Sequence, residues 1–167
     1  MINNIFLGLG SNKGDKLTYL RNTISEISND AKCRLIKVSS VYETSPLGNI
    51  NQDNFYNCVI EVETLYGVKD FYFNLKSIEY KFGRQEIYDK WSPREIDIDI
   101  LFYNNLIYDD NIITIPHKEI LNRDFVLTPL LEIAENFVHP VLKKRLAEID
   151  MSMVPPHIIQ KLNFLLI

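Results

Sequence analysis

The sequence predicts an α+β fold in which short strands and amphipathic helices alternate. Two segments place apolar residues three and four positions apart, which is the spacing of a helix with one buried face: Leu17 to Ile27 and Val68 to Phe82. Four others are apolar and rich in residues that favour strands: 4–10, 33–44, 55–64 and a segment that starts at Arg94. With 167 residues, the chain is long enough for one domain with a proper core.

The first half of the chain predicts a strand, a helix and a second strand. Residues 4–10, NIFLGLG, are typical of a short buried strand that ends at glycines. Asp15 is a suitable N-cap for the first helix because its carboxylate can accept from the free N–H groups of the first turn. Residues 33–44 predict one strand, and SPLG at 45–48 predicts a turn that leads into a polar loop.

The second half predicts a strand at 55–64 and a helix over 68–82, with Gly83 in the position of a C-terminal glycine cap. A charged loop, RQEIYDKWSP, leads to the strand from Arg94. A turn at 104–105, short extended pieces to about 116 and one or two helices to about 149 follow.

The resulting order is strand, helix, strand, strand, helix, strand. This is the split β-α-β arrangement of the ferredoxin-like fold, here with helical and extended additions at the C-terminal end. We expect residues 1–167 to form a single domain. The last residues, KLNFLLI, are expected to pack on the body of the protein or on a partner.

Composition excludes several classes of protein. The net charge is −4, and a general nucleic-acid binder would carry a basic surplus. No apolar run approaches the roughly 20 residues of a membrane helix, and the first residues do not resemble a signal peptide. The two cysteines, Cys33 and Cys58, have no metal-binding spacing, and free thiols fit a reducing cytosol. We therefore expect a cytoplasmic protein, and a monomer.

The strand from Arg94 alternates isoleucines with the acids Asp97 and Asp99, so one face is apolar and the other acidic. A solvated sheet face explains such a pattern. A metal site explains it as well, because alternate carboxylates on one strand face can share a divalent ion or hold two ions bridged by a polyphosphate.

The surroundings of the acids favour a site for a metal–polyphosphate complex. Arg84, Lys90 and Arg94 offer donors for phosphate oxygens, and His117 and Arg123 can add more. The segment 8–14, GLGSNKG, lacks the G-K-[ST] of a nucleotide-binding loop, so we interpret it as a strand-to-helix turn.

A second group of residues suits a planar ring. Phe55 and Asn57 share one face of their strand, and Phe125 follows the basic segment. Two aromatic side chains can enclose a ring while an amide recognises its edge, although core packing also accounts for each phenylalanine.

Several motifs, in order, resemble those of the 6-hydroxymethyl-7,8-dihydropterin pyrophosphokinase family. They are LGLGSNKGD, SSVYETSPLG, FYNCVIEVET, IEYKFGR, KWSPREIDIDIL and IPHKEILNRDFVLTPLLEIA, which span most of the chain. Residues 151–167 lie outside the resemblance. The resemblance implies an enzyme that transfers pyrophosphate from ATP to the hydroxymethyl group of the pterin, leaving AMP, with no covalent intermediate and no nucleic-acid or membrane partner.

The resemblance also implies roles for individual residues. Asp97 and Asp99 are expected to bind two Mg²⁺ ions, and the catalytic group also includes Arg84, Trp91 and Arg94. The residues expected around ATP are Glu79, Arg84, Arg94, Ile100, His117 and Arg123. Those expected around the pterin are Thr44, Ser45, Leu47, Phe55, Asn57, Trp91, Asp97 and Phe125.

Three positions depart from the family pattern. Ser92 replaces a small Gly or Ala, Glu86 stands where many members have a second basic residue, and Ile112 stands where some have arginine. Fewer positive groups predict weaker ATP binding or slower transfer. Two alternatives stay open: a ferredoxin-like ligand-binding module without catalysis, and a metal-dependent nucleotidyltransferase or nuclease that uses the same aspartates.

Overall fold

The computed structural model describes residues 1–49, 51–84 and 92–167. Its strands are β1 (Asn3–Ser11), β2 (Cys33–Val38), β3 (Val41–Thr44), β4 (Phe55–Thr64), β5 (Asp97–Tyr103), β6 (Tyr108–Asp109), β7 (Thr114–Ile115) and β8 (Ile158–Leu162). Its α-helices are α1 (Lys16–Asn29), α2 (Val68–Lys81) and α3 (Asp124–Ala134), with single turns η1 (Leu47–Asn49), η2 (Ile120–Asn122) and η3 (Leu146–Glu148).

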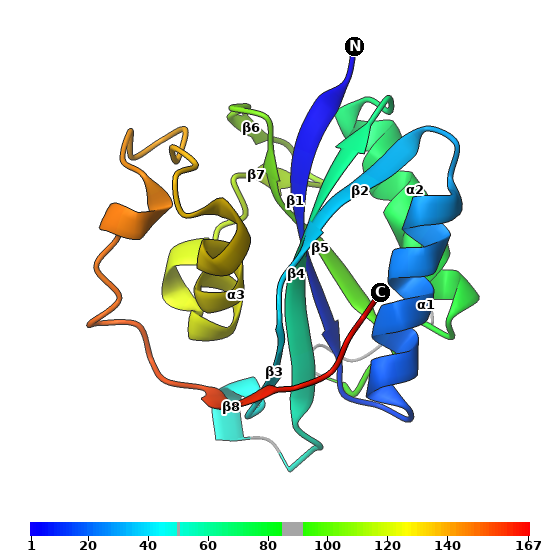
Figure 1. The fold of residues 1–167 in the computed structure, drawn as a ribbon, viewed down its shortest axis with the longest axis vertical. Helices are drawn as coiled ribbons and strands as arrows, with labels where there is room; N and C mark the ends of the chain where they lie inside the picture. Colours follow the sequence, from blue (N-terminus) through cyan, green and yellow to red (C-terminus); the bar gives the residue numbers. More distant parts are fainter. Residues whose placement is uncertain (50, 85–91) are drawn as a thin grey trace.

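The described residues form a six-stranded antiparallel sheet with the order β5-β1-β4-β3-β8, and β2 also pairs with β4. Helices α1 and α2 cover one face and α3 the other (Figure 1). A two-stranded sheet of β6 and β7 stands apart. The order of β5, β1, β4 and the β2–β3 pair is that of the ferredoxin-like fold, as the sequence predicts. No helix in the described ranges is long and apolar enough to cross a membrane.

The segment 33–44 forms two strands, so the prediction of a single strand is wrong. Ser39 causes the break. Its N–H donates to the carbonyl of Val59 at 2.9 Å, as in a regular ladder, but the N–H of Val59 donates to the Ser39 hydroxyl oxygen at 2.8 Å. A side chain thus replaces a backbone acceptor. As a result, β2 pairs with the second half of β4 and β3 with the first half.

The predicted helix ends are confirmed. The Asp15 carboxylate accepts the N–H of Thr18 at 3.1 Å and caps α1. Helix α2 ends at Lys81, and Gly83 has a φ of +108°, a value that side-chain-bearing residues rarely adopt.

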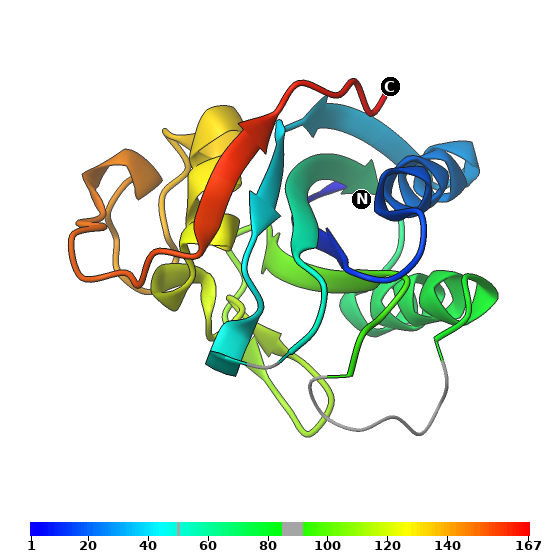
Figure 2. The same ribbon diagram turned by 90° about the horizontal axis from the view of Figure 1, so that it is seen from below.

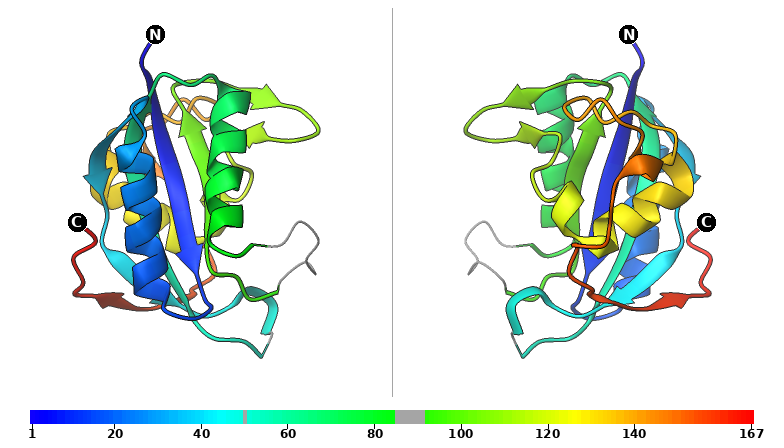
Figure 3. Two further views of the ribbon diagram at one scale, coloured as in Figure 1. Left: turned by 90° about the vertical axis from the view of Figure 1, so that its right-hand side faces the viewer. Right: turned by 90° about the vertical axis from the view of Figure 1, so that its left-hand side faces the viewer.

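The two faces of β5 serve different purposes. Ile98 and Ile100 are buried in the core under α1 and α2. On the other face, Leu101 packs with Val59 and Leu127 in a second core beneath α3. Figure 3 shows α1 and α2 on one side of the molecule and α3 on the other.

The acidic strand starts at Asp97 rather than at the predicted Arg94. Glu95 precedes it and forms an ion pair with Lys13. Only Asp97 and Asp99 therefore belong to the acidic face of the strand.

The C-terminal segment adds a strand to the sheet. Residues Ile158–Leu162 pair with β3 and lie beside it in Figure 2. Leu166 is buried in the core, and Arg21 donates to the carbonyl of Leu165. The expectation that this end packs on the body of the protein is confirmed.

Candidate functional site

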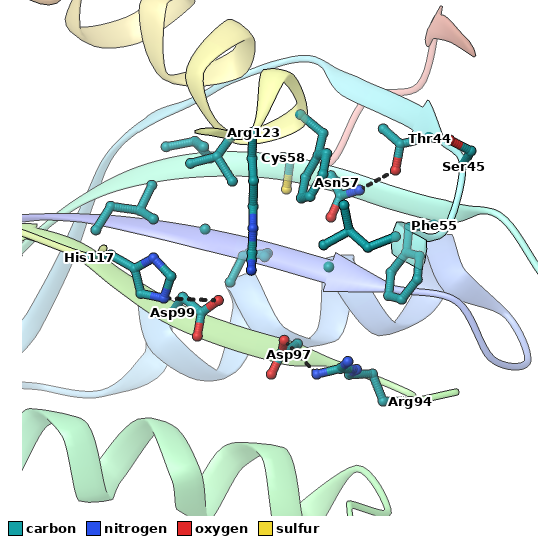
Figure 4. Close-up of a pocket in the computed structure, with 18 of the residues that line it drawn as sticks. Thr44, Ser45, Phe55, Asn57, Cys58, Arg94, Asp97, Asp99, His117 and Arg123 are labelled. Carbon is teal, nitrogen blue, oxygen red and sulfur yellow. Dashed lines mark hydrogen bonds and ion pairs between the residues drawn. The ribbon is translucent and has the colours of Figure 1, made fainter. Parts of the chain in front are cut away.

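A pocket of about 330 Å³ opens on the face of the sheet that also carries α3, because Val59 and Leu101, which pack in the core beneath α3, line it. It brings together most of the residues that the sequence singles out. Those that line it are Thr44, Ser45, Leu47, Phe55, Asn57, Arg84, Arg94, Asp97, Asp99, His117, Arg123 and Phe125. Figure 4 shows the charged residues on β5 and around it, and Phe55, Asn57 and Thr44 toward the other end.

Asp97 is held by two arginines. Its Oδ1 lies 2.7 Å from Nη1 of Arg84, and its Oδ2 lies 2.9 Å from Nη1 of Arg94. Burial by itself would raise the pKa of the Asp97 carboxyl, but the charges of Arg94, Lys76 and Arg84 outweigh it and lower the pKa below its usual value. Asp97 is therefore ionised at neutral pH.

Asp99 lies in a different environment although it is only two residues away. Within the described part of the chain, its one ion pair is with His117, whose Nε2 is 4.0 Å from Oδ2. Burial, and then the negative charge of Asp97, raise the pKa of the Asp99 carboxyl. A carboxylate with so little compensation is suited to receive a cation from solution.

The His117 ring is oriented by a backbone N–H two residues further along the chain. Its Nδ1 accepts the N–H of Glu119 at 3.2 Å, which leaves Nε2 as the nitrogen that carries a hydrogen. Arg123 is the residue immediately before α3, and its side chain reaches across the sheet toward the aspartates (Figure 4). Basic groups therefore face the acidic pair from several elements.

Glu79 does not line the pocket. Its side chain is fully buried, and it accepts hydrogen bonds from Lys76, Arg84 and the backbone N–H of Ile98. Burial raises the pKa of the Glu79 carboxyl, while Lys76 and Arg84 act in the opposite direction. Glu79 thus joins helix α2 to the strand that carries the aspartates.

Lys76 also lines the pocket, although the motifs in the sequence do not predict it. Its Nζ lies 2.8 Å from Glu79 Oε1 and donates to the carbonyl of Ile98 at 3.1 Å. Burial would lower the pKa of Lys76, but Glu79, Asp99 and Asp97 raise it, so the amine is charged. Lys76 and Glu79 each follow a buried apolar residue of α2 by one position, and this is the only signal in the sequence for their role.

The other end of the pocket is aromatic. Asn57 donates from Nδ2 to the Thr44 hydroxyl at 2.7 Å, and both side chains are buried. This bond turns the amide oxygen of Asn57 toward Gly10, where an added Cβ would lie 2.7 Å from it. The rings of Phe55 and Phe125 each have an arginine nearby, Arg94 at 6.0 Å and Arg123 at 5.9 Å from the ring centroid. A planar ligand with a polar edge suits this end.

Two further predictions differ from the structure, and a third concerns a residue that the structure does not describe. The side chain of Ile100 is 4% exposed and belongs to the core on the helical side of the sheet. Trp91 lies outside the described residues. The glycines at 8 and 10 lie within β1 and line the pocket, so they do not form the expected turn, whereas Gly14 has a φ of +65°. Gly8 and Gly10 are two residues apart, which is the spacing of residues on one face of a strand, and this spacing could have predicted their position.

Comparisons with known proteins agree on one family. The family model described as "7,8-dihydro-6-hydroxymethylpterin-pyrophosphokinase (HPPK)" matches residues 6–135. The 2-amino-4-hydroxy-6-hydroxymethyldihydropteridine pyrophosphokinase of Aquifex aeolicus is 39% identical over 144 residues, which cover 86% of this chain and 88% of that protein. The folic acid synthesis protein FOL1 of Dictyostelium discoideum is 41% identical over 84% of this chain, which spans 21% of that longer protein.

The fold is also found in solved structures. A crystal structure of an HPPK-DHPS in complex with substrates has a TM-score of 0.69 at 15% sequence identity. The match covers 88% of this chain and 42% of that one. A Plasmodium falciparum HPPK-DHPS gives the same TM-score at 17% identity, with 88% and 44% covered.

Proposed function

Because the chain belongs to the 7,8-dihydro-6-hydroxymethylpterin-pyrophosphokinase family, it is a pyrophosphokinase of folate biosynthesis, and we propose the reaction and the residues that perform it. The reaction is transfer of the terminal pyrophosphate of ATP to the hydroxymethyl group of 6-hydroxymethyl-7,8-dihydropterin. The products are AMP and the pterin diphosphate.

The observation that carries this proposal is a single pocket with two chemically different ends. One end places Asp97 and Asp99 among Lys76, Arg84 and Arg94. The other end holds an oriented amide and two phenylalanine rings. A triphosphate suits the charged end and a pterin suits the aromatic end, so the reacting groups would meet near Asp97.

The donor set fits Mg²⁺. Asp97 and Asp99 would hold it, and Asp99 has a carboxylate that no nearby cation within the described residues fully compensates. The described part of the chain contains no cluster of three or more His, Cys, Asp or Glu residues that could hold a metal ion. The triphosphate and water would therefore complete the coordination of Mg²⁺. Bound Mg²⁺ would withdraw charge from phosphate oxygens, and we propose two ions because the resemblance to the family implies two.

The protein contributes positioning and positive charge. The pterin hydroxyl attacks the β-phosphorus of ATP in line and displaces AMP, with no side chain as a nucleophile. Arg84 and Arg94, now paired with Asp97, would also donate to phosphate oxygens as negative charge develops. His117, Arg123 and Lys76 face the same region and would stabilise the leaving phosphate.

The aromatic end orients the second substrate. Phe55 and Phe125 enclose the pterin ring, and the Asn57 amide oxygen, held by Thr44, accepts from N–H groups at its edge. Ser45 and Leu47 complete the wall. This orientation directs the hydroxymethyl group toward the triphosphate, which is a proximity effect.

One incubation tests the reaction. The protein is mixed with ATP, Mg²⁺ and 6-hydroxymethyl-7,8-dihydropterin, and the products are separated by chromatography. AMP and pterin diphosphate in equal amounts are expected. ADP would indicate an ordinary kinase, free pyrophosphate a nucleotidyltransferase, and tight binding without turnover a ligand-binding module; each of these results would overturn the proposal.

We also propose that residues 1–167 act as one domain and as a monomer. Strands from both ends of the chain, β1 and β8, belong to the same sheet, which supports a single domain. Light scattering after size exclusion should give the mass of one chain, 19.5 kDa.

A further inference from the structure

His157 connects two walls of the aromatic end of the pocket through its backbone. The N–H of Ser45 donates to the carbonyl of His157 at 2.9 Å. In the other direction, the N–H of His157 donates to Oδ2 of Asp124 at 2.7 Å, and the N–H of Ile158 donates to the same oxygen at 2.9 Å. Ser45 lines the pocket, and Asp124 is the neighbour of both Arg123 and Phe125, which line it too.

The ring of His157 packs against one of the aromatic walls. The ring centroids of His157 and Phe125 are 5.8 Å apart with an interplanar angle of 85°, an edge-to-face contact. The His157 side chain is 18% exposed, and its Nδ1 lies 3.0 Å from the carbonyl oxygen of Pro155. The contact with the Pro155 carbonyl therefore fixes the His157 ring, and the ring in turn restricts the positions that the Phe125 side chain can adopt.

The carboxylate of Asp124 makes this contact rigid. Asp124 is 8% exposed, and its Oδ1 accepts the N–H of Phe125 at 2.8 Å while its Oδ2 binds the backbone at 157 and 158. One buried carboxylate thus joins the first turn of α3 to the start of β8, and β8 pairs with β3, which leads to Ser45. Both walls depend on the same short segment, which follows the residues matched by the family model.

We propose that His157 is a positioning residue for the pterin site: its ring, on a backbone segment tied to both walls, holds Phe125 in the orientation that stacks on the substrate. This inference rests on the proposed function only for the identity of the ligand. It assigns a role in substrate recognition to the C-terminal segment, apart from the triphosphate end.

The test compares three variants with the wild type. His157→Gln removes the ring but keeps a polar group, His157→Phe keeps a ring at the same position, and Lys161→Ala is the matched control. Lys161 lies on the same strand β8 and forms an ion pair with Glu132 without lining the pocket. All three keep the backbone hydrogen bonds of residue 157, and thermal unfolding checks that each is folded.

The measurement separates the two ends of the pocket. Calorimetry gives the Kd of a non-hydrolysable ATP analogue with Mg²⁺, and then the Kd of the oxidised, unreactive 6-hydroxymethylpterin added to that complex. We expect His157→Gln to raise the Kd of the pterin by about three- to tenfold, which corresponds to the free energy of an edge-to-face aromatic contact. The Kd of the ATP analogue should stay unchanged. His157→Phe should restore most of the affinity, and Lys161→Ala should match the wild type.

Equal pterin affinity in wild type and His157→Gln would overturn the inference. So would an equal loss for both ligands, or an equal loss in Lys161→Ala, because each would indicate general destabilisation. A wild type that binds pterin without turnover contradicts the proposed function alone, and the comparison of variants still decides on His157. A wild type that binds no pterin contradicts both.

Discussion

Glu79 accepts the backbone N–H of Ile98 at 2.6 Å, and Ile98 is the residue between Asp97 and Asp99. Lys76 donates to the carbonyl of the same Ile98 at 3.1 Å. Because β5 is at the edge of the sheet that the described residues form, no strand of this part of the chain lies beside these backbone groups on that side. Two side chains of α2 take the place of the missing strand and keep the two aspartates in position.

Glu79→Ala should lower the free energy of unfolding by about 3 kcal/mol, because it leaves a buried N–H without a partner and removes the carboxylate that pairs with Lys76 and with Arg84. Glu79→Gln should cost less, because its amide oxygen can still accept from Ile98. Urea unfolding measures both. Equal losses would mean that the hydrogen bond to Ile98 contributes little.

Lys76 and Glu79 should behave as a coupled pair. Lys76→Met alone removes one of the two cations that pair with a fully buried carboxylate and should be destabilising. The double variant Lys76→Met with Glu79→Gln should lose less than the sum of the two single losses, by about 1 kcal/mol, because no uncompensated charge remains. Additive losses in urea unfolding would contradict the coupling.

Replacement of the two aspartates should have opposite effects on stability in EDTA. Asp97→Asn should lower the Tm by a few degrees, because Arg94 loses the carboxylate it pairs with and Arg84 keeps its pair with Glu79 but loses the one with Asp97. Asp99→Asn should leave the Tm unchanged or raise it, because it removes repulsion from Asp97. With ATP, Mg²⁺ and pterin, both should lose most of their turnover. Near-normal kcat in either variant at saturating Mg²⁺ would refute the metal assignment.

The pH dependence of these two variants has a definite sign. The pKa of Asp97 is below its ordinary value of 3.8, so its stabilisation is present above that pH and is lost as the pH falls further. The pKa of Asp99 is above 3.8, so ionisation of Asp99 costs stability as the pH rises. The difference in Tm between the two variants should therefore shrink on acidification.

Gly10→Ala should weaken pterin binding, because the new Cβ would lie 2.7 Å from the amide oxygen of Asn57 and displace it. Gly8→Ala is the matched control on the same strand face, where the Cβ would meet a Leu101 methyl at 3.4 Å. Calorimetry with 6-hydroxymethylpterin should show a loss for Gly10→Ala that exceeds the loss for Gly8→Ala. Similar affinities would argue against a role for Asn57 at the ring edge.

Cys58 should resist alkylation in the folded protein. It is 1% exposed, and burial raises the pKa of its thiol to about 12. The thiol is therefore protonated at pH 8, and the stability associated with it is present below 9.0, the ordinary thiol pKa, and is lost as the pH rises toward 12. Half-buried Cys33 should react with iodoacetamide first, and Cys58 only after unfolding, as mass spectrometry of peptides can follow.

The sequence predicts those parts of the fold and the pocket that depend on local periodicity. The spacing of Asp97 and Asp99 is enough to place them on one face, and Asp15 and Gly83 are enough to bound two helices. The same rule puts Ile100 on the opposite face from Asp99, so its side chain is in the core, and a contact with ATP stays a prediction. The roles of Trp91 and of the two Mg²⁺ ions also stay predictions.

The remaining features depend on contacts between distant segments. The interruption at Ser39 requires a side-chain oxygen to meet Val59, twenty residues away. The position of Glu79 depends on how α2 packs along the edge of β5, and the contact of His157 with Phe125 depends on β8. No pattern within a short window of sequence distinguishes these residues from ordinary polar positions.

The floor of the pocket belongs to the hydrophobic interior, since Val59 and Leu101 both line it and pack in the core beneath α3. Substrates that cover this floor bind only the folded chain, and a ligand at 100 times its Kd adds about 2.7 kcal/mol to the free energy of unfolding. In a cell, the fraction of molecules exposed to proteases would then fall as substrate accumulates. The supply of pterin and nucleotide would thereby regulate how long each enzyme molecule survives.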